Sequence, residues 1–264
     1  MVKRWLTLFL LAALITGGLF QIEERFQLFR LRSLDVQPSA ILPNQMVWQH
    51  IPEKVRRFWP LLLFQRRRLV TTILEEIPVK ASLSLTGWGD FRLKVAPLTP
   101  WFMVFWKGSE WYLSVDGRIW SVHHNMNNVI LQQEPREGPI LVWTNSMYDL
   151  VSAPSRRVSL NSVMKSQAPV EKLQTWKEKL EELGYYKRID SIAVLQKDED
   201  LFLELLVRRS PRTVRMLIQA SPEKWEQLFP AVDEILKETS AVQRDLYIDA
   251  TYSGKILVRT ESGH

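Results

Sequence analysis

The amino-acid sequence predicts an α+β protein with a single N-terminal transmembrane helix, a β-α-α-β-β domain, and then a mostly antiparallel β domain with flanking helices. Three observations lead to this prediction: an uncharged apolar run near the N-terminus, period-2 alternation in many short segments, and helical periodicity in a few longer ones. The expected boundaries are a short cytoplasmic tail at 1–4, the membrane helix at 5–22, the first domain at 26–97 and the second at 98–264.

Composition limits the class of protein. Of the 264 residues, 46% are hydrophobic and 24% are charged, which excludes a wholly disordered chain and fits one or two packed domains. The chain has no cysteine, so disulfides, a thiolate nucleophile and a cysteine-ligated zinc are excluded. A formal net charge of +6 permits contact with an anionic surface without requiring nucleic acid.

The segment at 5–22 follows the basic pair Lys3 and Arg4 and contains no charged residue. A helix of this length spans roughly 27 Å, close to the hydrocarbon core of a bilayer. The alternative is a cleaved signal peptide, although the run is long for one and lacks an A-x-A cleavage site. Both interpretations place the rest of the chain outside the cytoplasm, and the length of the run favours an uncleaved anchor.

The first domain is predicted from alternation and from turn residues. Its strands are expected at 31–37, 79–85 and 91–95. Its helices are expected at 40–50 and 69–77. Pro78 ends the second helix, and the turn at 86–90 joins the last two strands into a hairpin. The apolar residues 59–64 are predicted to pack in the core.

The second domain is predicted in the same way. Its strands are expected at 101–106, 111–114, 118–120, 140–144, 157–160, 189–195, 201–207, 213–218, 245–251 and 255–260. Its helices are expected at 169–183 and 222–236. Gly184 is placed to end the first helix, and Ser221 to cap the second. Pro230 is predicted to kink or split that second helix.

The order of these elements resembles the FtsQ/DivIB family of bacterial cell-division proteins, in which a POTRA domain precedes a β domain. The segments that carry the resemblance are 29–36 (FRLRSLDV), 99–106 (TPWFMVFW), 111–120 (WYLSVDGRIW) and 248–258 (IDATYSGKILV). The resemblance implies a POTRA-like first domain and a location in the cell (inner) membrane at the division septum. It also implies that the C-terminal end binds small bitopic division proteins of FtsB and FtsL type.

No combination of residues in the sequence supports catalysis. Ser162 and Lys165 match the S-x-x-K pattern of penicillin-binding enzymes, but the accompanying K-T-G and S-D-N are missing, and 221–224 matches the same pattern at a helix start. His123 and His124 are adjacent, so in a strand they would point to opposite faces. We therefore expect no enzyme activity and no catalytic, cofactor-binding or metal-binding residue.

Two interpretations apply to the basic residues Arg66, Arg67 and Arg68. They form a candidate contact with membrane lipid or with an acidic partner. Alternatively, they cover a solvated face next to the apolar segment 59–64. Nucleic acid is not an expected partner, because this part of the chain is predicted to be exported.

The terminal hairpin is the candidate functional site. A C-terminal strand has no later segment to cover it, so its free flank can accept a partner strand by β-augmentation. The alternative is a strand that is fully paired inside the sheet. The residues predicted to form the partner-binding edge are Tyr252, Ser253, Gly254, Lys255, Ile256, Leu257 and Val258.

These expectations combine into a non-enzymatic, membrane-anchored scaffold of the bacterial divisome. It would recruit other single-span division proteins and link septal wall synthesis to constriction. The alternatives are a POTRA-bearing module for export or outer-membrane assembly, which should contain repeated domains or a barrel, and a secreted cell-wall enzyme, which should contain clustered reactive side chains.

Overall fold

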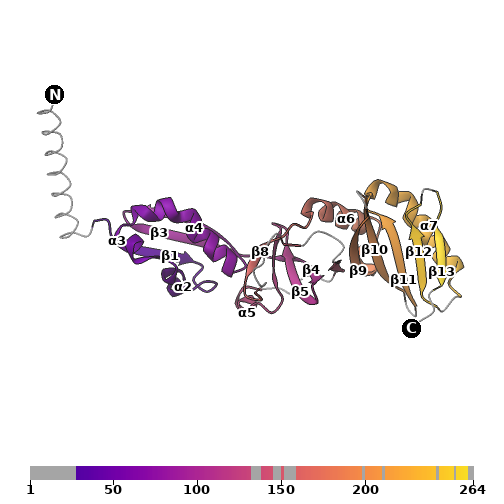
Figure 1. Ribbon diagram of the computed structural model, residues 1–264, viewed down its shortest axis with the longest axis horizontal. Helices are drawn as coiled ribbons and strands as arrows, with labels where there is room; N and C mark the ends of the chain where they lie inside the picture. The colour runs from indigo at the N-terminus through magenta and orange to yellow at the C-terminus, as the bar shows by residue number, and fades with distance from the viewer. Residues whose placement is uncertain are drawn as a thin grey trace, which may run out of the picture. The chain divides into compact units, whose positions relative to one another are not determined.

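The computed structural model describes residues 28–260, apart from 132–137, 145–149, 152–158, 198–199, 210–211, 242–243 and 253. The chain divides into two units, Met1–Pro97 and Leu98–His264, and each is described by itself. Figure 1 shows the order of the elements along the chain.

The predicted α+β class is corrected by the structure, whereas the predicted transmembrane helix falls on residues that it does not describe. The fold is mixed α/β. Residues 5–22 lie outside the described part, and within that part no helix is both long and apolar enough to cross a membrane. The longest helix of the described residues has 17 residues, with Arg66, Arg67 and Arg68 at its centre.

The first unit contains a three-stranded sheet and three helices. Its elements are β1 (Ser33–Gln37), α2 (Asn44–Gln49), α3 (Glu53–Arg57), α4 (Pro60–Glu76), β2 (Val79–Gly87) and β3 (Asp90–Pro97). The strand order is β1-β3-β2, with β1 parallel and β2 antiparallel to β3. The predicted strands and hairpin are confirmed, while the helical part contains three helices instead of two.

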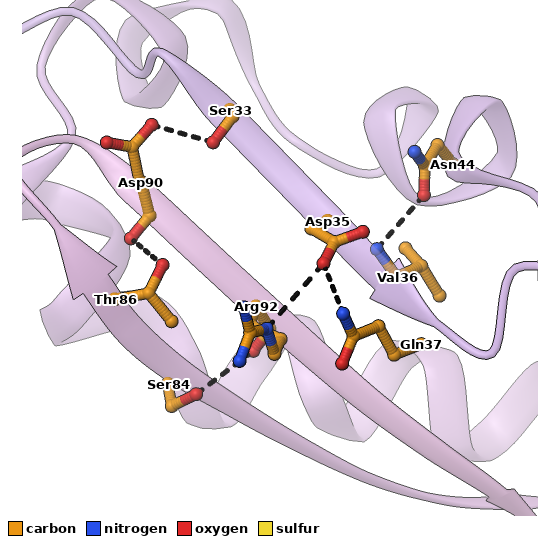
Figure 2. A network of polar contacts seen from close by, with 9 residues as sticks. All are labelled: Ser33, Asp35, Val36, Gln37, Asn44, Ser84, Thr86, Asp90 and Arg92. Carbon is orange, nitrogen blue, oxygen red and sulfur yellow. Dashed lines mark hydrogen bonds and ion pairs between the residues drawn. The ribbon is translucent and has the colours of Figure 1, made fainter.

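Polar contacts hold the parallel pair of β1 and β3 in register (Figure 2). The hydroxyl of Ser33 donates to the carboxylate of Asp90 at 2.6 Å, and Asp35 pairs with Arg92 at 3.6 Å. The amide oxygen of Asn44, the first residue of α2, accepts a backbone N–H of β1 at 3.1 Å. These contacts lie at exposed or half-buried positions, so they contribute little to the free energy of unfolding and mainly define how β1 aligns with its neighbours.

Helix α4 begins nine residues earlier than predicted, at Pro60. Proline has no backbone N–H, and it is favoured at this position because the N–H groups in the first turn of a helix have no partner within the helix. One stripe of the helix packs inward: Leu62, Leu69 and Ile73. The predicted burial of 59–64 is therefore right for Trp59 and Leu62 but wrong for Phe64, which is 84% exposed.

The second unit is built around one ten-stranded sheet. Its strands are β4 (Pro100–Trp106), β5 (Ser109–Ser114), β6 (Arg118–Ser121), β7 (Ile140–Trp143), β8 (Val163–Lys165), β9 (Ile189–Lys197), β10 (Asp200–Arg209), β11 (Arg212–Gln219), β12 (Leu246–Ala250) and β13 (Leu257–Thr260). Its helices are α5 (Asn127–Ile130), α6 (Val170–Glu182) and α7 (Trp225–Glu238), with short 3₁₀ turns at Tyr186–Arg188 and Pro222–Lys224. The strand order is β13-β12-β11-β10-β9-β7-β4-β5-β6-β8.

This sheet is mixed, which corrects the prediction of a mostly antiparallel domain with helices merely flanking it. Strands β4 and β7, β7 and β9, and β11 and β12 pair in parallel. The last pair follows directly from the chain path, because α7 connects β11 to β12 and a helical crossover returns the chain in the same direction.

Helices α6 and α7 pack against the same core of the sheet. Their buried side chains are Leu173, Trp176, Leu180, Trp225, Phe229, Val232 and Leu236. Pro230 was predicted to kink or split α7, and it does not split the helix, which runs from Trp225 to Glu238. Contrary to prediction, Ser221 makes no side-chain cap. Pro230 is exposed, so the helix loses one hydrogen bond there while its buried stripe stays continuous.

Three local differences concern turns and short strands. Lys107 and Gly108, with φ of 48° and 74°, form a tight turn between β4 and β5 that the sequence analysis missed. The strand predicted at 157–160 falls partly outside the described residues, and residues 159–160 are not in a strand. Strand β8 instead forms a few residues later, at Val163–Lys165.

Candidate partner-binding edge

Strand β13 is the terminal strand of the ten-stranded sheet, drawn in yellow in Figure 1. It pairs antiparallel with β12 and, within the described residues, with no other strand. Its four residues are all exposed, among them Leu257 at 40% and Val258 at 39%. The flank that faces away from β12 therefore presents backbone N–H and C=O groups to solvent.

The register shows which face each side chain of β13 occupies. Val258 lies opposite the fully buried Ile248, so it belongs to the face covered by the helices. Leu257 and Arg259 alternate with it and belong to the opposite face, where Arg259 lies opposite Tyr247. A strand added to this edge would thus meet an apolar side chain on each face of the sheet.

The face away from the helices carries charges of both signs next to this edge. Arg215 pairs with Glu204 at 3.1 Å. Partial burial raises the pKa of the Tyr247 phenol, and the carboxylates of Asp249 and Glu204 raise it further, while Arg259 and Arg215 act in the opposite direction. The Tyr247 phenol is therefore neutral at physiological pH, and acidic and basic side chains surround it.

A groove of about 620 Å³ opens beside the edge, between the start of α7 and the loop that joins β12 to β13. Its apolar lining includes Leu228, Ala250 and Ile256, and its polar lining includes Lys224 and Lys255. Its lining ends at Ile256, the residue before β13, so the groove lies next to the start of that strand. The sequence analysis did not find it, because α7 and the terminal loop are brought together only by the parallel crossover.

Hydrogen bonds fix the loop that forms one wall of this groove. The backbone N–H and the hydroxyl of Thr251 both donate to Asp249 Oδ1, at 3.1 and 2.7 Å. The side-chain amide of Gln219 donates to the carbonyl of Thr251 at 3.0 Å, and the indole of Trp225 donates to the carbonyl of Gln219 at 2.9 Å. Thr251, at the start of the loop, is thereby tied to β12 and β11.

The predicted site residues fall on the strand and on this loop. Leu257 and Val258 lie on β13. Those in the loop are Tyr252, Gly254, Lys255 and Ile256. Tyr252 is 57% exposed, and Gly254 adopts a φ of 71°, which favours glycine. The strand starts two residues later than predicted, since Ile256 packs against the core instead, and Ser253 lies outside the described residues.

Other sheet edges are less suited to strand addition. Strand β8 has three residues, and the adjoining Ser166 is already bridged to Val151. Strand β2, an edge of the first unit, has nine residues and exposes Lys80, Ser82 and Ser84. Polar side chains of this kind protect an edge from pairing. Strand β2 also exposes Leu85, at 44%, so β13 differs from it in exposing an apolar side chain on each face, Leu257 and Val258.

Two of the residues considered for chemistry, Ser162 and His124, take part in local hydrogen bonds. The hydroxyl of Ser162 donates to the carbonyl of Ser159 at 2.8 Å, within a turn, and Lys165 lies on β8. His124 is buried and its Nδ1 accepts the N–H of Met126 at 3.1 Å. In the part of the chain that the structure describes, no group of three side chains has the composition of a metal site.

Arg66, Arg67 and Arg68 are exposed on α4. They belong to the first unit, whereas the edge belongs to the second, so they are not part of the partner-binding edge.

The sequence matches no protein-family model, and no curated protein is significantly similar to it. The likeness to the FtsQ/DivIB family therefore depends on the four sequence segments alone.

Proposed function

We propose that this protein is a non-catalytic scaffold of the bacterial divisome that binds small bitopic proteins of FtsB or FtsL type by strand addition at β13. Through such contacts it would recruit other division proteins and link septal wall synthesis to constriction. The proposed place of action is the division septum at the cell membrane.

The observation that carries the proposal is the free flank of β13, a terminal strand with exposed apolar side chains on both faces. Main-chain hydrogen bonds along this flank would supply affinity, and the neighbouring groove would select the side chains of the partner. Such an interface is small, so a shared membrane location would raise its effective strength.

Proline substitution tests the edge directly. Alternate residues of a strand direct their N–H groups to opposite flanks, so one of Val258→Pro and Arg259→Pro removes a bond to β12 and the other removes a donor from the free flank. Thermal unfolding distinguishes the two variants, because only the first should lower the melting temperature. Ser82→Pro on β2 is the matched control at another edge.

The variants are compared by recovery of the FtsB-type and FtsL-type proteins of the same cell from detergent-solubilised membranes, detected with specific antibodies. We expect the variant that keeps its stability but lacks the outward donor to lose both partners, while Ser82→Pro retains them. Equal recovery with all three variants would contradict strand addition at β13.

A further inference from the structure

The end of the first unit at which the described chain begins is covered by aromatic side chains. Phe29 contacts Phe58 and Trp88, with ring centroids 5.4 and 5.9 Å apart, and Trp88 also packs edge-on against Trp59 at 5.3 Å. Trp59 is buried, but Phe58 and Trp88 remain 43% and 53% exposed. These rings come from three separate segments of the chain, so the fold itself gathers them.

The first turns of α4 extend this aromatic surface. Because Leu62 and Leu69 face the sheet, the neighbouring Leu63 and Phe64 point outward, and Phe64 is 84% exposed. The start of α4 is joined to the aromatic end, since the carbonyl of Trp59 accepts the N–H of Leu62 at 2.8 Å. An aromatic side chain this exposed on a helix adds nothing to the core of the unit.

The next turn of the same helix is strongly basic. Arg66, Arg67 and Arg68 are all exposed, and within the described residues no carboxylate lies within 4.0 Å of them. Residues 28–74 contain eight Lys and Arg but only two Asp and Glu, an excess equal to the net charge of +6 of the whole chain. The positive charge of this protein is therefore concentrated in the first unit.

The chain enters the unit at the same place. The indole N–H of Trp88 donates to the carbonyl of Leu28 at 2.6 Å, which joins the first described residue to the aromatic surface. Trp88 therefore lies next to the first described residues of the unit.

We propose that Phe58, Leu63, Phe64 and Trp88, together with Arg66, Arg67 and Arg68, form a surface that binds the headgroup region of an anionic lipid bilayer. Aromatic rings are favoured at the boundary between headgroups and acyl chains, and arginine binds lipid phosphates while its stem lies along apolar surface. A basic cluster next to such rings adds attraction to anionic lipid. An acidic protein would match the arginines but would not account for aromatic side chains around the point of chain entry.

Depth-dependent quenching in the full-length protein tests the proposal. Because the chain has no cysteine, Leu63→Cys provides a single site for an environment-sensitive dye and leaves the exposed rings intact. Ser82→Cys, exposed on β2 of the same unit, is the matched control. Each labelled protein is combined with vesicles of phosphatidylcholine, with or without phosphatidylglycerol, that contain a lipid-borne quencher.

We expect a blue shift and quenching at position 63 in vesicles with phosphatidylglycerol, and neither at position 82. Replacing the three arginines by glutamine should abolish the signal at position 63, with the circular dichroism spectrum unchanged. Equal quenching at both positions, quenching that does not depend on phosphatidylglycerol, or no quenching at position 63 would overturn the proposal. This result is independent of strand addition at β13, because the labels and the substitutions all lie in the first unit.

Discussion

Ile248 and Val258 lie directly opposite each other in the pair of β12 and β13, yet Ile248 is fully buried whereas Val258 is 39% exposed. The difference arises because β12 has a neighbour on each side and β13 has one. The boundary between the core of the second unit and its free edge thus runs between these two side chains.

This boundary predicts unequal effects of truncation. Ile248→Ala should lower the free energy of unfolding by about 2–4 kcal/mol, because it leaves a cavity in the core. Val258→Ala should lower the free energy of unfolding by less than about 1 kcal/mol, because the Val258 side chain is only partly buried. Urea denaturation of both variants measures the difference. Equal losses would mean that β13 is covered in solution.

Arg212 is predicted to be important for the stability of the second unit. Its guanidinium is buried and donates to the carbonyls of Leu236 and Thr239, at 3.1 and 2.5 Å, at the end of α7. Arg212→Ala should therefore cost about 2–4 kcal/mol, since buried carbonyls lose a charged donor. Arg215→Ala, on the same strand but in an exposed ion pair with Glu204, is the control and should cost less than about 1 kcal/mol. Calorimetry that found equal costs would contradict this assignment.

Replacing Pro230 should stabilise the protein. An interior proline costs a helix roughly 3 kcal/mol relative to alanine, partly offset by its stiffening of the unfolded chain. Because α7 runs through the exposed Pro230, Pro230→Ala should raise the free energy of unfolding by about 1–3 kcal/mol. Urea denaturation tests this expectation, and a variant no more stable than the natural chain would show that the proline geometry itself is needed.

Tyr186 should make stability depend on pH in the alkaline range. Burial, and next the charge of Glu181, raise the pKa of its phenol to about 12. The unfolded chain loses this proton near pH 10, so the stabilisation is complete below about pH 10 and is lost as the pH rises towards 12, by about 1.4 kcal/mol per pH unit. Tyr186→Phe should reduce that slope in urea titrations. An unchanged slope, after agreement of the two proteins at pH 7, would show that the phenol is not responsible.

Much of the fold follows from the sequence because apolar periodicity decides it. Alternation located the strands of both units, and the stripe of Leu173, Trp176 and Leu180 located α6 within one residue. Two failures share a cause. Pro60 at the start of α4 was not recognised as a helix start, and Pro230 was expected to interrupt α7, but burial of Leu62 in α4 and of Phe229 in α7 stabilises both helices.

The candidate site was only partly predictable. That the last strand ends the chain is visible in the sequence, and its place at the end of the sheet follows once β12 is known to lie beside β11. The groove was not predictable, because Leu228 and Ile256 meet only through a crossover whose parallel sense the prediction missed. Likewise, the exposure of Phe64 depends on where α4 begins.

The central claim, that β13 accepts a partner strand, is tested most directly by amide hydrogen exchange resolved to single residues. Exchange at Leu257–Thr260 is measured with and without the extracytoplasmic segment of the FtsB-type protein of the same cell. Strand addition predicts that the amides not bonded to β12, which are alternate residues of β13, become protected on binding. Binding that leaves these amides unchanged and protects another surface would contradict the claim.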